Sequence, residues 1–189
     1  MSTLTQTVLP SQSQSIPVIR YQRRHAGDAV ERLVDATPPA TVVGLSIQQD
    51  KDRVVAFALA TPTTIVIISS LDPLAVIPKD DTFARFVSGA KDQALLVGFS
   101  MPRLAVHLQG ALKMHVRGAD LSTVIAKSTL EPMYPSEVFK KVGMPVDKFG
   151  VDSAWHESNG DDESGRSRKL CLQAWLSAMY VPSRSVVWC

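Results

Sequence analysis

Three closely spaced β-rich runs constrain the fold more than any other feature of the sequence. They cover residues 41–48, 53–60 and 63–70, and only short polar or proline-containing turns separate them. Such turns join antiparallel neighbours, because a parallel connection needs a crossover of about a dozen residues or more. The sequence therefore predicts an antiparallel three-stranded unit.

After this unit the pattern alternates between helix and strand. Residues 80–88 place apolar side chains at helical spacing, and Gly89 follows as a stop signal. Residues 94–98 are continuously apolar, which is typical of a strand buried on both faces and parallel to its neighbour. A helix over residues 101–110 and a short strand over 116–121 come next. Further helices are predicted over residues 28–36, 136–142 and 169–181.

Both ends of the chain and one internal stretch are predicted to lie outside the packed core. Residues 1–17 are rich in Ser, Thr and Gln and bury too little apolar surface to become ordered, so we expect a flexible segment. The folded domain then spans residues 18–182, with a polar surface loop at 152–167. Residues 183–189 form a C-terminal tail.

Composition indicates a globular domain. The 189 residues are 45% apolar and 20% charged, which suits one packed unit. The apolar runs are far shorter than the ~20 residues of a membrane span, so we expect no membrane association. The first residues lack the pattern of a secretory signal, and Cys171 and Cys189 have neither zinc-site nor disulfide spacing. An intracellular location, nucleus or cytoplasm, is expected.

The order of the elements and their local sequences resemble those of a ribonuclease-H-like family, the DEDD-type 3′–5′ exonucleases of the ribonuclease D and Werner-type group. Residues 42–48, VVGLSIQ, resemble its first strand, which reads approximately hydrophobic-hydrophobic-Gly-hydrophobic-Asp-x-Glu. Residues 53–60 and 63–68 resemble its second and third strands. Residues 96–121 are similar to its second-motif region and the strand after it, and residues 170–180 to its closing helix, where members carry Tyr-x-x-x-Asp.

The resemblance extends over residues 16–180 and implies an α/β fold. We expect a ribonuclease-H-like mixed sheet, with three antiparallel strands plus parallel strands, flanked by helices. Family members hold two divalent metal ions between four acidic residues, and these ions activate the nucleophile and stabilise the leaving 3′ oxygen. Hard cations such as Mg²⁺ need oxygen ligands, largely carboxylates. An unrelated α/β fold is the alternative.

None of the positions that the resemblance assigns to these acids carries a carboxylate. The family's acids fall on Ser46, Gln48, either Pro102 or Arg103, and Trp175, while its tyrosine falls on Cys171. Glutamine lacks the charge of glutamate, and arginine repels a cation. Shifting the alignment by one residue supplies no acid, because residues 44–49, 93–109 and 169–180 contain neither Asp nor Glu. We therefore expect a pseudo-exonuclease with no catalytic residue, no metal and no cofactor.

Other residues that carry chemistry favour structural roles. Asp50 and Asp52 fit a solvated hairpin turn better than a metal site, and Asp120 fits a cap on the turn that follows it. The four histidines include no i, i+4 pair typical of metal ligands. Cys171 is more typical of a small core residue than of a nucleophile.

Two basic clusters are candidate contacts for nucleic acid, one before the first helix and one before the last. They comprise Arg20, Tyr21, Arg23 and Arg24, and Arg166, Arg168 and Lys169. Phosphate contacts would give salt-dependent affinity, and Tyr21 or Trp155 would stack on an unpaired base. The alternative is that these basic groups are simply solvated, since a net charge of +2 does not by itself indicate a nucleic-acid-binding protein.

Three hypotheses follow. The first is an inactive exonuclease-like domain that acts as an adaptor for a protein partner, single-stranded RNA or both, within a nucleic-acid-processing complex. Family members that resemble this chain in lacking the acids act as scaffolds or RNA-binding partners. The second is an active exonuclease with displaced acids, which would use Mg²⁺ or Mn²⁺. The third is a homo-oligomeric scaffold that pairs uncovered apolar faces.

Overall fold

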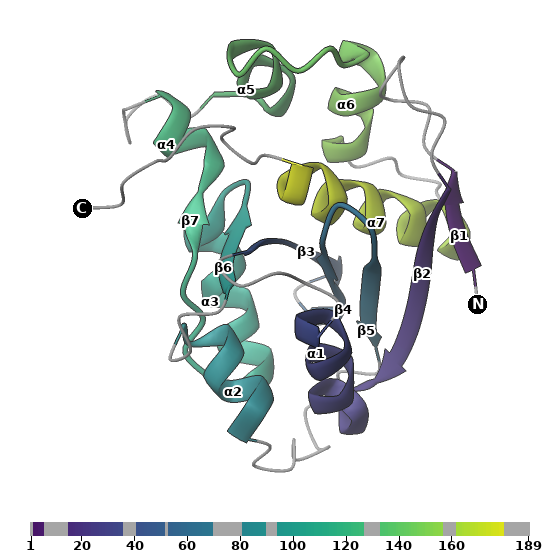
Figure 1. Cartoon of the computed structure of the whole chain (residues 1–189), viewed down its shortest axis with the longest axis vertical. Helices are drawn as coiled ribbons and strands as arrows, with labels where there is room; N and C mark the ends of the chain where they lie inside the picture. Colours follow the sequence, from purple (N-terminus) through teal and green to yellow (C-terminus); the bar gives the residue numbers. More distant parts are fainter. Residues whose placement is uncertain are drawn as a thin grey trace.

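The computed structural model describes residues 2–5, 15–35, 41–51, 53–69, 81–89, 94–126, 133–156 and 162–179. Within these residues, seven strands form one sheet with the order β1-β2-β5-β4-β3-β6-β7 (Figure 1). The strands are β1 (Ser2–Thr5), β2 (Ser15–Gln22), β3 (Thr41–Asp50), β4 (Arg53–Ala60), β5 (Ile65–Ser69), β6 (Ala94–Gly98) and β7 (Ala119–Asp120).

Helices cover both faces of this sheet (Figure 1). One face packs against α1, α2 and α3, and the other against α7, with α5 and α6 beside it. The helices are η1 (Arg23–His25, a 3-10 turn), α1 (Ala26–Asp35), α2 (Asp81–Val87), α3 (Met101–Leu112), α4 (Leu121–Ala126), α5 (Pro135–Lys141), α6 (Lys148–Trp155) and α7 (Glu163–Met179). Among the helices that the structure describes, none has both the length and the apolar character needed to cross a membrane.

The strand pairing confirms the predicted mixed sheet. β3 pairs antiparallel with β4, and β4 pairs antiparallel with β5, as the short turns require. β6 lies parallel to β3, with Val43 opposite Leu96, and it reaches that place after the α2 crossover. The continuous apolar run of β6 is explained by helices on both faces of the sheet.

The N-terminal prediction is wrong for residues 2–5 and 15–17, because β1 and β2 extend the sheet. β2 pairs parallel with β5, with Val18 opposite Ile65, and β1 pairs antiparallel with β2. Alternate residues Ile16 and Val18 face the core and are buried, which supplies the apolar surface that the polar composition concealed. Residues 6–14 and the predicted tail at 183–189 lie outside the described residues.

The predicted polar loop at 152–167 is also wrong over most of its length. α6 continues to Trp155, because Val151 and Ala154 are buried on one side of that helix. α7 begins at Glu163, where the carboxylate of Asp162 accepts a hydrogen bond of 2.7 Å from the backbone N–H of Gly165. Residues 157–161 of this stretch lie outside the described part of the chain.

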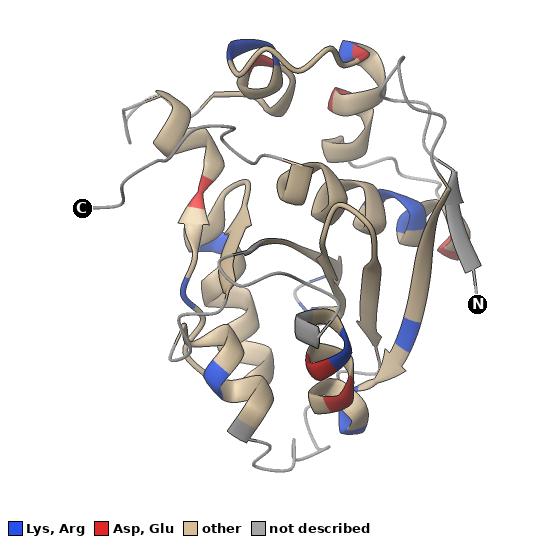
Figure 2. Cartoon of the chain, in the orientation of Figure 1, with Lys and Arg blue, Asp and Glu red and all other residues tan. Residues whose placement is uncertain are grey.

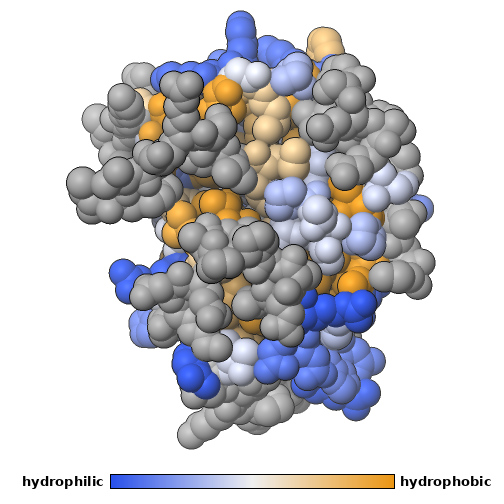
Figure 3. All heavy atoms as spheres, in the orientation of Figure 1, coloured by the Kyte–Doolittle hydropathy of each residue, from blue (hydrophilic) through white to orange (hydrophobic). Residues whose placement is uncertain are grey.

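The helix α1 shows the expected division between a buried and a charged side. Ala29, Val30 and Leu33 are buried against the sheet and α2, while Asp28 and Arg32 are exposed. Figure 3 shows hydrophilic surface over α1, at the lower right of the face that it draws. Asp28 lies in the first turn and is 3.1 Å from Nδ1 of His25. The predicted helix is confirmed, beginning two residues before Asp28.

A glycine lets β3 and α7 approach each other closely. A side chain at Gly44 would overlap the carbonyl oxygen of Ala174 and lie 2.6 Å from the amide nitrogen of Ala178. Real Cβ atoms do not approach backbone atoms so closely, so only glycine fits here. The close contact holds α7 across the part of β3 where the candidate site begins.

Candidate functional site

A cleft of about 360 Å³ opens where β3 and β6 end. The end of β3 lines it, together with the turn after β6 and the first residues of α3. The end of α6 and one side of α7 complete the lining. Ligands of open α/β sheets commonly bind outside the carboxyl ends of the strands, as here.

The alternation of β3 aims two polar side chains at α7. Leu45 belongs to the apolar cluster with α1, α2 and α3, so its neighbours along the strand face the other way. Ser46 lies opposite Ala58 and Gln48 opposite Ala56, and both alanines belong to the cluster with α7. Ser46 is buried and Gln48 is half-buried, and both line the cleft.

Gln173 of α7 joins three elements at the base of the cleft. Its side-chain oxygen accepts a hydrogen bond from the hydroxyl of Ser46 on β3. Its side-chain nitrogen donates a hydrogen bond of 2.6 Å to the carbonyl oxygen of Ala154 on α6. An amide can accept and donate at once, whereas a carboxylate can only accept. This geometry therefore fits glutamine rather than glutamate.

The charged side chains of the cleft lining are basic. Arg103 comes from α3, and Arg166 and Lys169 come from α7, where Figure 2 shows basic residues on the N-terminal half of the helix. His156, which follows α6, also lines the cleft, and its carbonyl oxygen accepts a hydrogen bond of 3.0 Å from the ammonium group of Lys169. Within the part of the chain that the structure describes, no Asp or Glu lines the cleft.

An aromatic pair forms part of the same wall. Trp155 is half-buried, and its ring meets that of Phe99 edge to face, with ring centroids 5.0 Å apart and an interplanar angle of 74°. Phe99 also packs on Phe139 of α5, with centroids 5.8 Å apart. These contacts fix the position of the indole beside the basic groups.

Solved structures with the same arrangement of elements identify the fold. The catalytic core of RRP6 from Trypanosoma brucei matches with a TM-score of 0.60 and 14% sequence identity, over 94% of this chain and 49% of that one. RNase D of Escherichia coli, an exoribonuclease involved in structured RNA processing, matches with a TM-score of 0.58 and 11% identity, over 86% and 42%. The EXO domain of Nibbler from Aedes aegypti matches with a TM-score of 0.54 and 14% identity, over 92% and 87%.

The chain has the DEDD-type 3′–5′ exonuclease fold. It spans less than half the length of the RRP6 and RNase D chains that it matches. No protein-family model matches the sequence, and no curated protein matches it. The similarity to these proteins is therefore a similarity of fold.

The residues in the cleft do not fit the two metal ions that the exonuclease resemblance implies. A pair of Mg²⁺ or Mn²⁺ ions needs several carboxylates, and this lining offers hydroxyl, amide and basic groups instead. Over the described residues, no group of three or more His, Cys, Asp or Glu side chains could hold a metal ion. We derive no catalytic step through a metal in this cleft.

Asp120 is fully engaged in capping. One carboxylate oxygen accepts a hydrogen bond of 2.7 Å from the N–H of Met101 at the start of α3, and the other accepts one of 2.9 Å from the N–H of Ser122 in α4. The predicted capping role is thus confirmed. Asp50 is exposed at the end of β3, and Asp52 lies outside the described residues.

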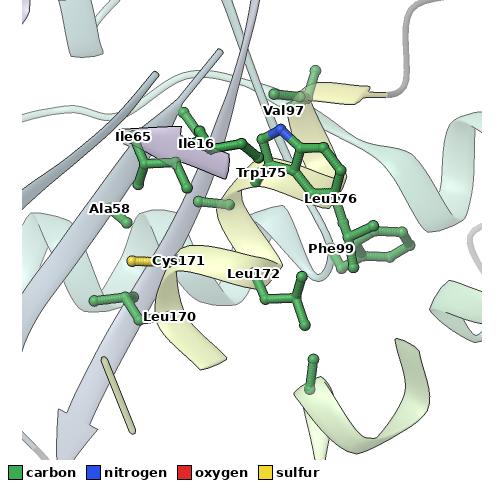
Figure 4. Packing of buried hydrophobic residues seen from close by; sticks show 14 of the residues in the cluster. Ile16, Ala58, Ile65, Val97, Phe99, Leu170, Cys171, Leu172, Trp175 and Leu176 are labelled. Carbon is green, nitrogen blue, oxygen red and sulfur yellow. The ribbon is translucent and has the colours of Figure 1, made fainter. Parts of the chain in front are cut away.

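Two of the predicted active-site positions lie in the core and one on the surface. Trp175 is fully buried, and its ring N–H donates a hydrogen bond of 3.1 Å to the carbonyl oxygen of Pro62. Cys171 is buried on the same side of α7, among Ala58, Leu170 and other apolar residues (Figure 4). Pro102 is exposed on α3 and does not line the cleft. Only Ser46, Gln48 and Arg103 of that set meet in the cleft.

Burial determines the chemistry of Cys171. Desolvation raises the pKa of its thiol from 9.0 to about 11, and the charge of Arg20 opposes that shift. A thiol that is protonated at neutral pH and buried does not act as a nucleophile. The core role that the sequence favours for Cys171 is therefore confirmed.

Gln173 is the α7 residue that the sequence prediction missed. It lies two positions before Trp175, and it shares one side of α7 with Ser177 and with Arg166 and Lys169 of the predicted second basic cluster. The missed signal is this stripe of polar residues at helical spacing within an otherwise apolar helix.

The two predicted basic clusters are not brought together. Arg166 and Lys169 line the cleft, while Arg168 is exposed outside its lining. None of the residues of the first cluster lines the cleft: Arg20, Tyr21, Arg23 and Arg24. Arg23 is buried in η1, and its guanidinium group donates a hydrogen bond of 3.5 Å to the carbonyl oxygen of Ala111. Tyr21 packs against the apolar cluster that includes α1.

Proposed function

We propose that this domain is a catalytically inactive 3′–5′ exonuclease-like domain that acts as an adaptor. It would hold single-stranded RNA, a protein partner or both within a nucleic-acid-processing complex. The observation that carries the proposal is the absence of any carboxylate from the cleft lining among the described residues, where Ser46, Gln48 and Gln173 meet.

Electrostatics supports this proposal. Two-metal catalysis requires anionic ligands that offset the charge of two dications close together. Arg103 and Arg166 line this cleft from α3 and α7, and each contributes a guanidinium group, which is a positive charge. Metal ions entering such a site would meet repulsion rather than coordination.

Exposed aromatic side chains support the protein-partner part of the proposal. Phe149 of α6 is 84% exposed and Tyr134, next to α5, is 70% exposed. Aromatic residues are enriched at protein interfaces, where one large side chain often contributes much of the affinity. Neither side chain lines the cleft.

A trimming assay tests the proposed inactivity. Homogeneous protein is incubated with 5′-labelled single-stranded RNA and DNA in the presence of Mg²⁺ or Mn²⁺, and the products are separated by length. We expect full-length oligonucleotide at all times. Stepwise shortening from the 3′ end that needs the metal would favour the active exonuclease with displaced acids, provided that the Gln48→Lys variant, which adds a positive charge inside the cleft, loses it.

A further inference from the structure

The base of the cleft is closed by hydrogen bonds within the protein. Ser46 donates to Gln173, and Gln173 donates to Ala154, so β3, α6 and α7 are joined by one hydroxyl and one amide. Both groups already have partners, and no cation is needed to join these elements. A ligand must therefore be held by the other side chains that line the cleft.

The charged side chains in the rest of the cleft lining are cationic, and they extend from helices on opposite faces of the sheet. Arg103 extends from α3, which packs on one face, and Arg166 from α7, which packs on the other. Both are exposed, and no carboxylate of the described residues forms an ion pair with either. Lys169 adds a third positive charge at the same wall, where its ammonium group also contacts the carbonyl oxygen of His156.

Cationic side chains that meet in one cleft, with no acid among the described residues of its lining, match a phosphate group. A guanidinium group donates two parallel hydrogen bonds to phosphate oxygens, and it keeps its charge at any physiological pH. Trp155 stands in the same cleft with its ring fixed by Phe99, and an indole face stacks on any base. The cleft volume of about 360 Å³ suits a ligand of about one nucleotide.

We propose that this cleft binds an end nucleotide of single-stranded RNA through its phosphate, without a metal ion, with Arg103 and Arg166 supplying the positive charge. The inference rests on the proposed function, because it requires that the cleft performs no cleavage. Trp155 stacks on the base, and the rest of the strand leaves the cleft past the exposed arginines.

The test is fluorescence anisotropy of a labelled single-stranded RNA with the full chain, measured in EDTA and again in Mn²⁺. We expect equal affinity in both buffers. Arg103→Glu and Arg166→Glu should each weaken binding at least tenfold, because each replaces an attraction to phosphate by a repulsion. The neutral variants R103Q and R166Q should each lower the slope of log affinity against log salt by about 0.7, the value of one phosphate contact on a single strand.

The matched control is Arg168→Glu, which makes the same charge change on α7 outside the cleft lining. It should change affinity less than threefold. Trp155→Ala should weaken binding with no change in the salt slope, since stacking displaces no counterion. All three arginines are exposed, so thermal unfolding of these charge variants should match that of the unchanged protein.

Competition separates the sources of phosphate. Inorganic phosphate and a nucleoside monophosphate are added to the complex, and we expect the monophosphate to compete better than phosphate but more weakly than unlabelled RNA. A monophosphate that competes as well as RNA would overturn the assignment to an RNA end in favour of a free nucleotide.

Two results would overturn the cleft assignment itself. One is equal weakening by Arg168→Glu and Arg166→Glu, which would indicate diffuse attraction to α7. The other is loss of RNA binding in EDTA, which would show that a metal holds the phosphate. Neither result requires trimming of RNA, so failure of this inference and failure of the proposed inactivity are read from different assays.

Discussion

At the scale of single residues, Gln173 best explains why this cleft differs from a metal site. Its amide accepts from Ser46 and donates to Ala154, and no carboxylate can replace both bonds. The sequence shows a glutamine in an apolar stretch, but it does not show what the amide contacts, because both partners are distant along the chain. The contact depends on the phase of α7 and on the position of α6.

Replacing Gln173 by glutamate is expected to destabilise the fold by about 1–3 kcal/mol at pH 7, since the carbonyl oxygen of Ala154 loses its donor and faces a carboxylate. The deficit should shrink near pH 4, where a protonated carboxyl group regains a donor. Urea unfolding at both pH values measures the effect. Gln109→Glu, on the exposed side of α3, is the control and should change stability by less than about 0.5 kcal/mol.

Cys171 is expected to resist thiol reagents at pH 8 in the native protein. Its pKa is raised to about 11 by burial, so the reactive thiolate is scarce and inaccessible. Because the pKa in the folded protein lies above the ordinary value of 9.0, the contribution of this thiol to stability should be complete below about pH 9 and decline as the pH rises toward 11. Labelling of a Cys189→Ser variant with and without urea measures the reactivity of the Cys171 thiol. Rapid labelling without urea would contradict the burial of Cys171.

At the scale of elements, the local sequence pattern was sufficient to predict the strands whose type depends on neighbouring residues in the sequence. The hairpin turns at the ends of β4 specified three antiparallel strands, and the apolar run of β6 specified a buried parallel strand. β2 was missed because its polar composition hides the alternation of two buried residues. The side of α7 that faces the cleft was predicted wrongly. The resemblance assigned the family's Tyr-x-x-x-Asp pattern to Cys171 and Trp175, and both of these residues face the core.

The contact between β3 and α7 predicts opposite effects for two glycine substitutions. Gly44→Ala should destabilise the protein by about 3 kcal/mol or more, because the new methyl group overlaps the backbone of α7. Gly110→Ala in α3 should stabilise it by up to about 1 kcal/mol, because no atom lies within 4 Å of the added carbon and alanine favours a helix.

Thermal and urea unfolding of the two alanine variants provide the measurement. A Gly44→Ala variant as stable as the unchanged protein would show that β3 and α7 do not approach as closely as described. The Gly110→Ala variant controls for the general effect of replacing glycine by alanine, since both changes add one methyl group.

At the scale of the whole molecule, this chain combines the exonuclease fold with a cleft whose described charged residues are basic. The solved RRP6 and RNase D structures match 94% and 86% of this chain, with TM-scores of 0.60 and 0.58. The resemblance in the sequence was sufficient to predict this fold, and Ser46 and Gln48, which it singled out, both line the cleft. The basic character of the cleft emerged only from the structure, because Arg103 and Arg166 are 63 positions apart and meet through packing.

The response of thermal unfolding to Mn²⁺ tests the central claim most directly. We compare the unchanged protein with a variant that carries carboxylates in the cleft, Ser46→Asp, Gln48→Glu, Arg103→Asp and Gln173→Asp. A metal ion at a hundredfold excess over its Kd adds about 2.7 kcal/mol, which raises Tm by roughly 5–10 °C in a chain of this size. We predict no shift for the unchanged protein and a rise for the variant, whereas a rise of that size in the unchanged protein would contradict the account.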